Sequence, residues 1–385
     1  MREASVVIVG GGPAGLSAAG ALERMGVQSV VLDRDDRIGG SWARRYERLH
    51  LHTVRRFSGL AHFPIPTRYP RYLSKNQYAE YLQEYANHLG LQVELNTNVV
   101  GIRREHVDGR ASAYIVETPG DAWRCSNVVI ATGKFCEPSM PAFRDIERFR
   151  GISFHASSYH TGRAYAGKRV LVVGLGNTGA EIAADLIEQG AAGVTVSVRT
   201  SPTIVPRDAL GLPIQETGML LSLLPPSVAD RIAAFVARFT VGNLSAYGIG
   251  PPQWTPFIND RPPVIDVGFL RNLKAKRITA RPDLRRFTND GVEYADGREE
   301  AFDVVILATG FTTGLERILK VPETLDASGA PRRASPGSTP PGLYFIGYRQ
   351  TNRGLLFETE IDSRRLATAI AANRAPAGRV RDGGA

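Results

Sequence analysis

The chain has few of the residues that build redox or metal centres. Its 385 residues include two cysteines, Cys125 and Cys136, which do not form a C-x-x-C pair. A dithiol reductase mechanism therefore has no support, and inert thiols in a reducing compartment are the simpler interpretation. The seven histidines show no metal-ligand spacing, so we predict no metal site.

Long apolar runs are also missing. No stretch of about 18 apolar residues occurs, which argues against a transmembrane helix. The N-terminal residues lead directly into an expected strand and leave no room for a secretory signal, so we expect a cytoplasmic protein. The net charge is +9, but the basic residues are scattered. Anionic cofactors and an anionic substrate explain that balance at least as well as nucleic acid, and we expect no nucleic-acid partner.

Glycine, in contrast, is abundant, with 40 residues, and one glycine-rich loop lies at residues 10–15 (GGGPAG). It follows a short β-branched run typical of a buried parallel strand and precedes a helical pattern. Gly10 permits a tight turn, Gly12 lets the backbone reach a pyrophosphate, and Gly15 allows the helix to pack on the strand. The next strand, residues 30–32, is followed by Asp33, which is placed to bind a ribose hydroxyl.

A second loop of the same kind occupies residues 174–179 (GLGNTG), after a predicted strand at 169–173. Here the next strand, residues 194–198, is followed by Arg199 and Thr200 and not by an acid. An acid would bind the 2′-hydroxyl of NAD and repel a phosphate, whereas Arg199 can pair with a 2′-phosphate. The second loop therefore predicts NADPH.

Between the loops, residues 149–159 read FRGISFHASSY, with the spacing F-x-G-x-x-x-H-x-x-x-Y. This resembles the fingerprint of flavin-containing monooxygenases, and Gly39-Gly40-Ser41-Trp42 resembles their G-G-x-W element near the flavin. Residues 46–52 (YERLHLH) narrow the resemblance to the YUCCA group of plant flavin monooxygenases. Where the wider family has an asparagine near the reactive edge of the flavin, this chain has His52. A catalytic role and a structural role for His52 are equally consistent with the sequence.

The resemblance implies an α/β fold of two Rossmann-type dinucleotide-binding domains, with the NADPH domain inserted into the FAD domain. We expect FAD-domain residues at 1–155 and 313–373, the inserted domain at 156–312, and a disordered tail at 374–385. The turns Ala131-Thr132-Gly133 and Ala308-Thr309-Gly310 mark the two crossings between domains. The cofactor-binding residues predicted in this way are Gly10, Gly12, Pro13, Ala14, Gly15, Asp33, Arg34, Gly40, Ser41, Trp42, His52, Thr53, Ala131, Thr132, Gly133, His155, Ser157, Tyr159, Gly174, Gly176, Asn177, Thr178, Gly179, Arg199, Thr200, Ala308, Thr309, Gly310 and Gly347.

The implied function is that of an FAD- and NADPH-dependent monooxygenase, which oxygenates a small molecule with O₂ through a flavin C4a-(hydro)peroxide. The YUCCA-like pattern implies oxidative decarboxylation of an aryl 2-oxo acid such as indole-3-pyruvate. Oxygenation at nitrogen or sulfur stays open. So does Baeyer–Villiger insertion, although its fingerprint has tryptophan at the position of Tyr159. An NADPH–flavin reductase that passes electrons to a partner is a further alternative, and the sequence leaves the oligomeric state open, a dimer included.

Three other segments carry helical patterns. Residues 77–89 place tyrosines on one face, which favours packing, and a final helix is expected at 359–373. Residues 219–240 predict two amphipathic helices interrupted by Pro225-Pro226. These helices could line a substrate entrance or lie on a membrane surface, but packing against the protein is the commoner outcome.

Overall fold

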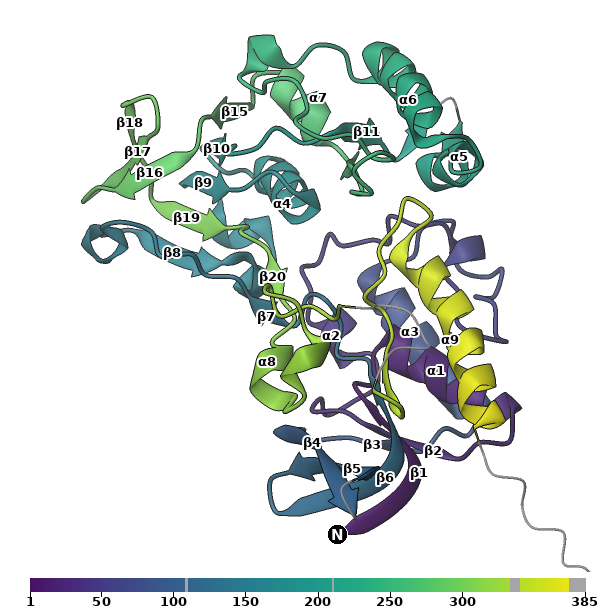
Figure 1. The fold of residues 1–385 in the computed structure, drawn as a ribbon. Coiled ribbons are helices and arrows are strands. Elements are labelled where there is room, and N and C mark those ends of the chain that lie inside the picture. Colours follow the sequence, from purple (N-terminus) through teal and green to yellow (C-terminus); the bar gives the residue numbers. More distant parts are fainter. Residues whose placement is uncertain (108–109, 210, 333–339, 374–385) are drawn as a thin grey trace, which may run out of the picture.

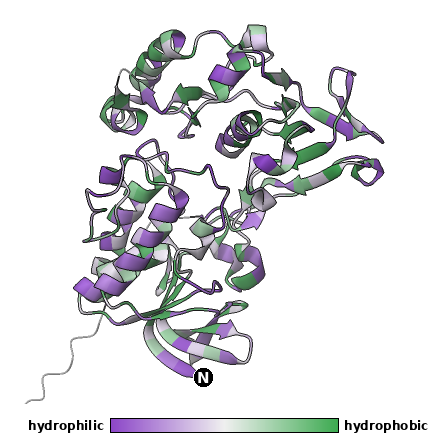
Figure 2. Cartoon of the chain, turned by 180° about the vertical axis from the view of Figure 1, so that it is seen from behind, coloured by the Kyte–Doolittle hydropathy of each residue, from purple (hydrophilic) through white to green (hydrophobic). Residues whose placement is uncertain are grey.

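The computed structural model describes residues 1–107, 110–209, 211–332 and 340–373. These residues form two lobes, each built around a mainly parallel sheet (Figure 1). Hydrophobic residues gather in the central strands of both lobes (Figure 2). The α/β fold with two dinucleotide-binding domains is confirmed, whereas the predicted tail at 374–385 lies outside the described residues.

The first lobe contains a seven-stranded sheet in the order β3-β2-β1-β6-β5-β4, with β21 paired to β6. Strand β1 pairs in parallel with both β2 and β6, and its residues Val6, Val7 and Ile8 are completely buried. Helices α1 and α9 pack on one face of the sheet. The elements of this lobe are β1 (Arg2–Val9), α1 (Pro13–Arg24), β2 (Ser29–Leu32), α2 (Gly40–Ala43), η1 (Arg55–Phe57), α3 (Lys75–His88), β3 (Val93–Glu94), β4 (Gly101–Val107), β5 (Arg110–Thr118), β6 (Asp121–Ile130), α8 (Leu315–Ile318), η6 (Pro322–Thr324), β21 (Leu343–Phe345) and α9 (Leu355–Ala372).

The second lobe contains a five-stranded parallel sheet in the order β15-β10-β9-β19-β8. Helices α4 and α7 cover one face, and the antiparallel strands β16–β18 pack on the other. Its elements are η2 (Ile146–Arg148), β8 (Ile152–His155), η3 (Ala156–Ser158), η4 (Gly162–Tyr165), β9 (Arg169–Val173), α4 (Asn177–Glu188), β10 (Gly193–Ser197), β11 (Ile204–Pro206), β12 (Asp208–Ala209), β13 (Leu212–Pro213), α5 (Ile214–Leu221), α6 (Pro226–Thr240), η5 (Ser245–Tyr247), β14 (Val264–Asp266), α7 (Phe269–Lys274), β15 (Ile278–Arg281), β16 (Leu284–Phe287), β17 (Gly291–Tyr294), β18 (Glu299–Ala301) and β19 (Val304–Leu307).

The chain crosses between the lobes twice, and the two crossings run side by side. Strand β7 (Glu137–Pro138) on the outward path pairs antiparallel with β20 (Phe311–Thr312) on the return, between the two lobes (Figure 1). Strand β8 is already part of the second sheet, where it pairs in parallel with β19. We therefore propose that the inserted unit begins before residue 152, a few residues earlier than the sequence-based division at 156.

Local sequence explains most of the helices. Helix α3 begins with a capping box in which Ser74 and Gln77 satisfy each other's backbone N–H groups, and its tyrosines are buried, which confirms their packing role. The final helix α9 begins at Leu355, four residues earlier than predicted. The interrupted pattern at 219–240 forms α5 and α6, but the expectation that their apolar side chains pack against the protein is wrong for most of the large ones, which are exposed.

Candidate active site

The two glycine loops have the same backbone geometry. Gly10 and Gly174 begin the loops with φ angles of +108° and +105°, which favour glycine. A Cβ atom at Gly10 would lie 2.7 Å from the carbonyl oxygen of Ala131, and one at Gly174 would lie 2.7 Å from that of Ala308. Each loop is thus pressed against one of the two A-T-G turns, which places both predicted crossings beside the predicted cofactor loops.

The other glycines of the two loops fall into two kinds, those packed tightly within the loop and those that face open space. A Cβ atom at Gly15 or Gly179 would lie 1.8 or 2.0 Å from the carbonyl oxygen of the first glycine of its own loop. A Cβ atom at Gly12 or Gly176 would meet nothing within 4 Å. These two residues are also the N-caps of α1 and α4, and no side chain caps either helix. Each loop therefore fits a dinucleotide diphosphate, because free N–H groups face open space at a helix N-terminus.

The residues after β2 and β10 differ as the sequence predicts. Asp33 accepts hydrogen bonds from the backbone N–H groups of Gly11 and Asp35, the latter at 2.8 Å, and burial raises the pKa of its carboxyl group. Arg199 is exposed and has no hydrogen bond or ion pair within the described ranges. The Gly174 N–H donates to the carbonyl oxygen of Ser197 at 2.9 Å, so Arg199 and its neighbour Thr200 follow directly beside the second loop.

The G-G-x-W element forms the short helix α2 on the surface of α3. Gly39 precedes it with a φ angle of +73°, and a Cβ atom there would lie 2.9 Å from the carbonyl oxygen of Ala79. The Trp42 ring meets Tyr78 edge to face, with ring centroids 4.7 Å apart. Packing on α3 accounts for this geometry, and contact of Trp42 with the flavin stays a prediction.

His52 reaches across to the second lobe. Its Nε2 atom lies 2.6 Å from Oε1 of Glu181, which is only 2% exposed and lies on α4. Tyr46 of the first lobe is buried next to the same carboxylate, and burial together with Glu181 raises the pKa of the Tyr46 hydroxyl well above its ordinary value. Two side chains of the first lobe therefore contact the helix that begins at the second glycine loop.

Two further acids on α4 also bind side chains, Asp185 within the second lobe and Glu188 across the lobe interface. The Tyr159 hydroxyl donates to Oδ2 of Asp185 at 2.6 Å, and Nη2 of Arg48 donates to Oε1 of Glu188 at 3.0 Å. We call Glu181, Asp185 and Glu188 the carboxylate row. Their spacing of four and three residues places them on one side of the helix. Our sequence reasoning missed the row, although acids at helical spacing within the apolar pattern AEIAADLIE were a usable signal.

The fingerprint residues lie at the crossings. His155 Nε2 donates to the carbonyl oxygen of Gly310 at 2.9 Å, and Nδ1 accepts from the backbone N–H of Ser157 at 3.1 Å. Burial lowers the pKa of His155, which favours the neutral ring that this pattern requires. His155 thus joins the end of β8 to the returning crossing, and direct contact of His155, Ser157 or Tyr159 with a cofactor stays a prediction.

The returning strand closes the first site. Gly347 follows β21 with a φ angle of +81°, and a Cβ atom there would lie 2.7 Å from Cβ of Ala14. The hydroxyls of Thr132 and Tyr348 lie 2.8 Å apart, and Tyr348 is buried. The first glycine loop, the first A-T-G turn and the returning strand therefore meet at one place.

Helix α5 supplies a second bridge between the lobes, which the sequence did not predict. The buried Gln215 accepts from the backbone N–H of Val54 at 2.8 Å and donates to the carbonyl oxygen of Arg353 at 2.7 Å. The neighbouring Asn352 has a buried Oδ1 atom without a hydrogen-bond partner in the described part of the chain.

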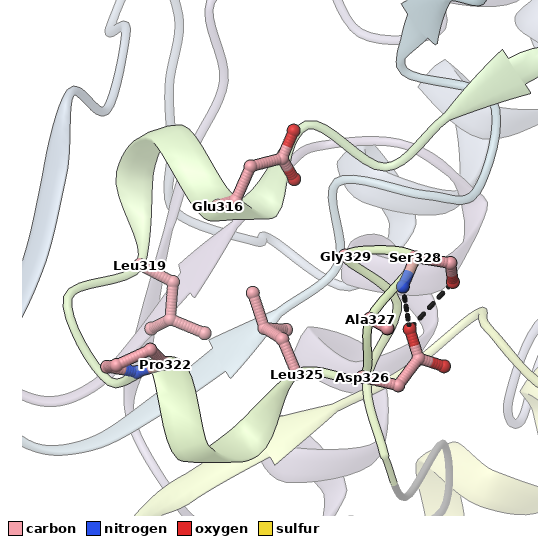
Figure 3. A pocket seen from close by; sticks show the side chains of 8 residues that line it. All are labelled: Glu316, Leu319, Pro322, Leu325, Asp326, Ala327, Ser328 and Gly329. Carbon is pink, nitrogen blue, oxygen red and sulfur yellow. Dashed lines mark hydrogen bonds between the residues drawn. The ribbon is translucent and has the colours of Figure 1, made fainter.

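A separate hollow lies in the first lobe between α8 and the turn at residues 326–329 (Figure 3). Its volume is about 390 Å³, and its lining includes Leu319, Pro322 and Leu325. Asp326 accepts hydrogen bonds from the backbone N–H and the hydroxyl of Ser328, which lowers its pKa. The lining contains no residue of either glycine loop, so this hollow is not the cofactor site.

Comparisons with known proteins agree with this architecture. The model of the pyridine nucleotide-disulphide oxidoreductase family matches residues 7–209. The chain is 36% identical over 381 residues to indole-3-pyruvate monooxygenase YUCCA1 of Oryza sativa subsp. japonica, covering 94% of this chain and 90% of the relative. A double mutant (Gln to Arg, His to Thr) of the flavin monooxygenase from Stenotrophomonas maltophilia superposes with a TM-score of 0.75 at 26% identity, covering 97% and 99% of the two chains. A structure of OTEMO in complex with FAD and NADP shares the fold, with a TM-score of 0.70 at 18% identity over 96% and 84%.

The chain therefore belongs to the flavin-containing monooxygenases, with the YUCCA indole-3-pyruvate monooxygenases among its relatives. It is an FAD- and NADPH-dependent monooxygenase. The family model also carries the name of disulphide reductases, but Cys125 and Cys136 are both free thiols. Within the described ranges, no helix has the length and apolarity needed to cross a bilayer.

Proposed function

We propose that the enzyme oxygenates an aryl 2-oxo acid of the indole-3-pyruvate type and releases CO₂. The observation that carries this proposal is the 36% identity to an indole-3-pyruvate monooxygenase over 94% of the chain. The balanced reaction consumes the 2-oxo acid, O₂, NADPH and one proton. It yields the acid shortened by one carbon, CO₂, NADP⁺ and water.

A pair of partly exposed aromatic rings near the α5 bridge supports a substrate of this class. Phe57 and Phe357 pack edge to face with centroids 5.7 Å apart, and both remain partly exposed. The guanidinium of Arg56 lies 4.4 Å from the Phe57 ring centroid, and that of Arg353 lies 5.2 Å from the Phe357 ring centroid. Arg353 is paired with Glu358, whereas Arg56 is exposed and has no ion pair in the described ranges. An aryl ring on the phenylalanines and a carboxylate at Arg56 would suit this arrangement.

The cofactors are assigned to the two loops on their geometry. FAD would lie on the first loop, with its ribose at Asp33, and NADPH on the second, with its 2′-phosphate at Arg199. The Stenotrophomonas double mutant carries introduced Arg and Thr residues, the same residue types that follow β10 here. Bound FAD supplies the redox and oxygen chemistry, while the protein orients both nucleotides and excludes water.

The inter-lobe contacts hold the two sites in one relative position. His52 and Tyr46 contact Glu181, Arg48 contacts Glu188, and these acids lie on the helix that would hold the NADPH diphosphate. We therefore assign His52 a positioning role at the lobe interface, in place of the catalytic role that the sequence left open.

Incubation with indole-3-pyruvate and phenylpyruvate under ¹⁸O₂ tests the substrate class. We expect the corresponding acetic acids, each with one labelled oxygen, in amounts that match NADPH consumption. Arg56→Ala should raise KM for both acids with little change in kcat, and Arg56→Lys should restore part of the loss. Label in an amine, thioether or ketone, with the 2-oxo acids unconsumed, would show a different substrate class. Electron transfer to an acceptor without label in any product would show a reductase.

A further inference from the structure

Helix α6 lies at the outer end of the second lobe (Figure 1). It leaves a row of large apolar side chains exposed. We call Val228, Ile232, Phe235 and Phe239 the apolar stripe. At 3.6 residues per turn the four positions fall within roughly 60° of the helix circumference. Phe235 is 65% exposed and Phe239 is 74% exposed, and their rings pack against each other with centroids 5.0 Å apart.

The inward face of α6 fixes this orientation. Small side chains face the protein, and Ala229 is completely buried. Asp230, also buried, accepts hydrogen bonds from the Thr255 hydroxyl at 2.7 Å and from the backbone N–H groups of Phe257 and Ile258 at 3.0 and 2.9 Å. A surface helix normally turns its large apolar residues towards the core. Here Ala229 and the anchored Asp230 do so, and Phe235 and Phe239 are left outside.

The apolar surface continues into α5 and the turn that follows it. Leu220, Leu223 and Leu224 are exposed there, directly before α6 begins. Contiguous apolar patches on this scale mark binding surfaces in soluble proteins. The apolar stripe and these three leucines together form one apolar surface at this end of the second lobe.

The charges on this surface have one sign. Between residues 217 and 259 the only charged side chains are Asp230, Arg231 and Arg238, and Asp230 is buried. Both arginines are exposed, have no ion pair in the described ranges, and lie beside the stripe on one flank, about 70–90° around the helix from its centre. An apolar helix face flanked by arginines matches the pattern of helices that lie in the interface of an anionic membrane.

We propose that α6, together with the end of α5, binds the surface of an anionic phospholipid bilayer. Phe235, Phe239 and the leucines would enter the boundary between headgroups and acyl chains, and the two arginines would contact lipid phosphates. A second copy of the chain fits less well, because a two-fold interface brings the same patch of both copies together. Four arginines would then face each other without an exposed acid from this surface to pair with them.

Flotation of the FAD-loaded protein with vesicles tests the proposal. We expect binding to vesicles of phosphatidylcholine with phosphatidylglycerol, weaker binding to phosphatidylcholine alone, and loss of binding as salt rises. Each arginine near an anionic surface contributes about fivefold to affinity, so Arg231→Ala with Arg238→Ala should weaken binding about 30-fold. Phe235→Ser with Phe239→Ser should abolish it.

The matched control is Met140→Ser, which removes another exposed apolar side chain far along the chain from α6 and should bind as the unaltered protein does. Unchanged FAD content and unfolding midpoint in each variant separate loss of binding from loss of folding. The proposal is overturned if the unaltered protein fails to float with the anionic vesicles at low salt. It is equally overturned if the phenylalanine variants convert a dimer in solution to a monomer while vesicle binding persists.

Discussion

The pair formed by His52 and Glu181 gives the sharpest test of how the lobes are held together. The two atoms are 2.6 Å apart, and the carboxylate is almost completely buried. A hydrogen bond that involves a charged group contributes about 1.5–3 kcal/mol to stability. Because 22% of the His52 side chain is exposed, we take the lower end of that range, about 1.5 kcal/mol, or roughly tenfold in an equilibrium constant.

A double-mutant cycle measures this coupling directly. His52→Ala, Glu181→Gln and the double variant are compared by denaturant unfolding, and the single changes should be non-additive by about 1.5 kcal/mol. Both single variants should keep FAD, and both should release more hydrogen peroxide per NADPH consumed, because the lobes are less firmly positioned. His50→Ala is the control, since His50 is exposed and, among the described residues, its Nδ1 hydrogen-bonds only the nearby carbonyl oxygen of Arg48.

Additivity of the two changes within about 0.5 kcal/mol would show that the pair contributes no coupling. A different pattern would restore the catalytic interpretation of His52. In that case His52→Ala would raise hydrogen peroxide release strongly, while Glu181→Gln would leave product formation fully coupled to NADPH consumption.

Three other predictions follow from the cofactor loops and the crossing. Arg199→Ala should weaken NADPH binding about 10- to 100-fold with NADH use nearly unchanged; coenzyme titrations check this, and an unchanged preference refutes the assignment. Gly12→Ala should fold normally but lose FAD, and Gly176→Ala should keep FAD but lose NADPH affinity, because both added Cβ atoms enter open space where a diphosphate would lie. Gly15→Ala, by contrast, should destabilise the fold itself, because its Cβ atom would clash with the first glycine of the loop. Flavin content and unfolding midpoints separate these outcomes. Burial lowers the pKa of His155 in the folded protein, so its contribution to folding stability is fully present above the unfolded pKa of about 6.5 and is lost as pH falls below that value. The unfolding midpoint should therefore fall less steeply with decreasing pH in His155→Gln than in the unaltered protein.

The cofactor loops were predictable because the signal lies within a few consecutive residues. Strand, glycines and helix follow one another in each loop, and the need for glycine at Gly10 or Gly15 arises from atoms of the same loop or the adjoining turn. The position of Arg199 was predictable for the same reason, since it lies two residues after the strand beside the loop, and its role at a 2′-phosphate stays a prediction. The positions of His155 and the A-T-G turns came from resemblance, and the structure adds the hydrogen bond that explains them.

The lobe interface was not predictable, because its partners lie far apart in the sequence. His52 and Glu181 are separated by 129 positions, and Val54 and Gln215 by 161. Helical periodicity shows which residues share a face but not which distant segment that face will meet. The same limit explains α6: its pattern predicts a stripe, while the direction of the stripe depends on the anchoring of Asp230 by residues 255–258.

The adjacent crossings at β7 and β20 have a consequence for how such an enzyme can be rebuilt. Phe311 pairs with Pro138 and Thr312 with Glu137, so the chain leaves the first lobe and re-enters it at neighbouring points. The coenzyme-binding lobe is therefore a cassette with its two ends together. A related lobe with different coenzyme specificity could be exchanged at this two-stranded junction without moving the ends of the flavin lobe apart. The carboxylate row would then be the part that a replacement cassette has to reproduce.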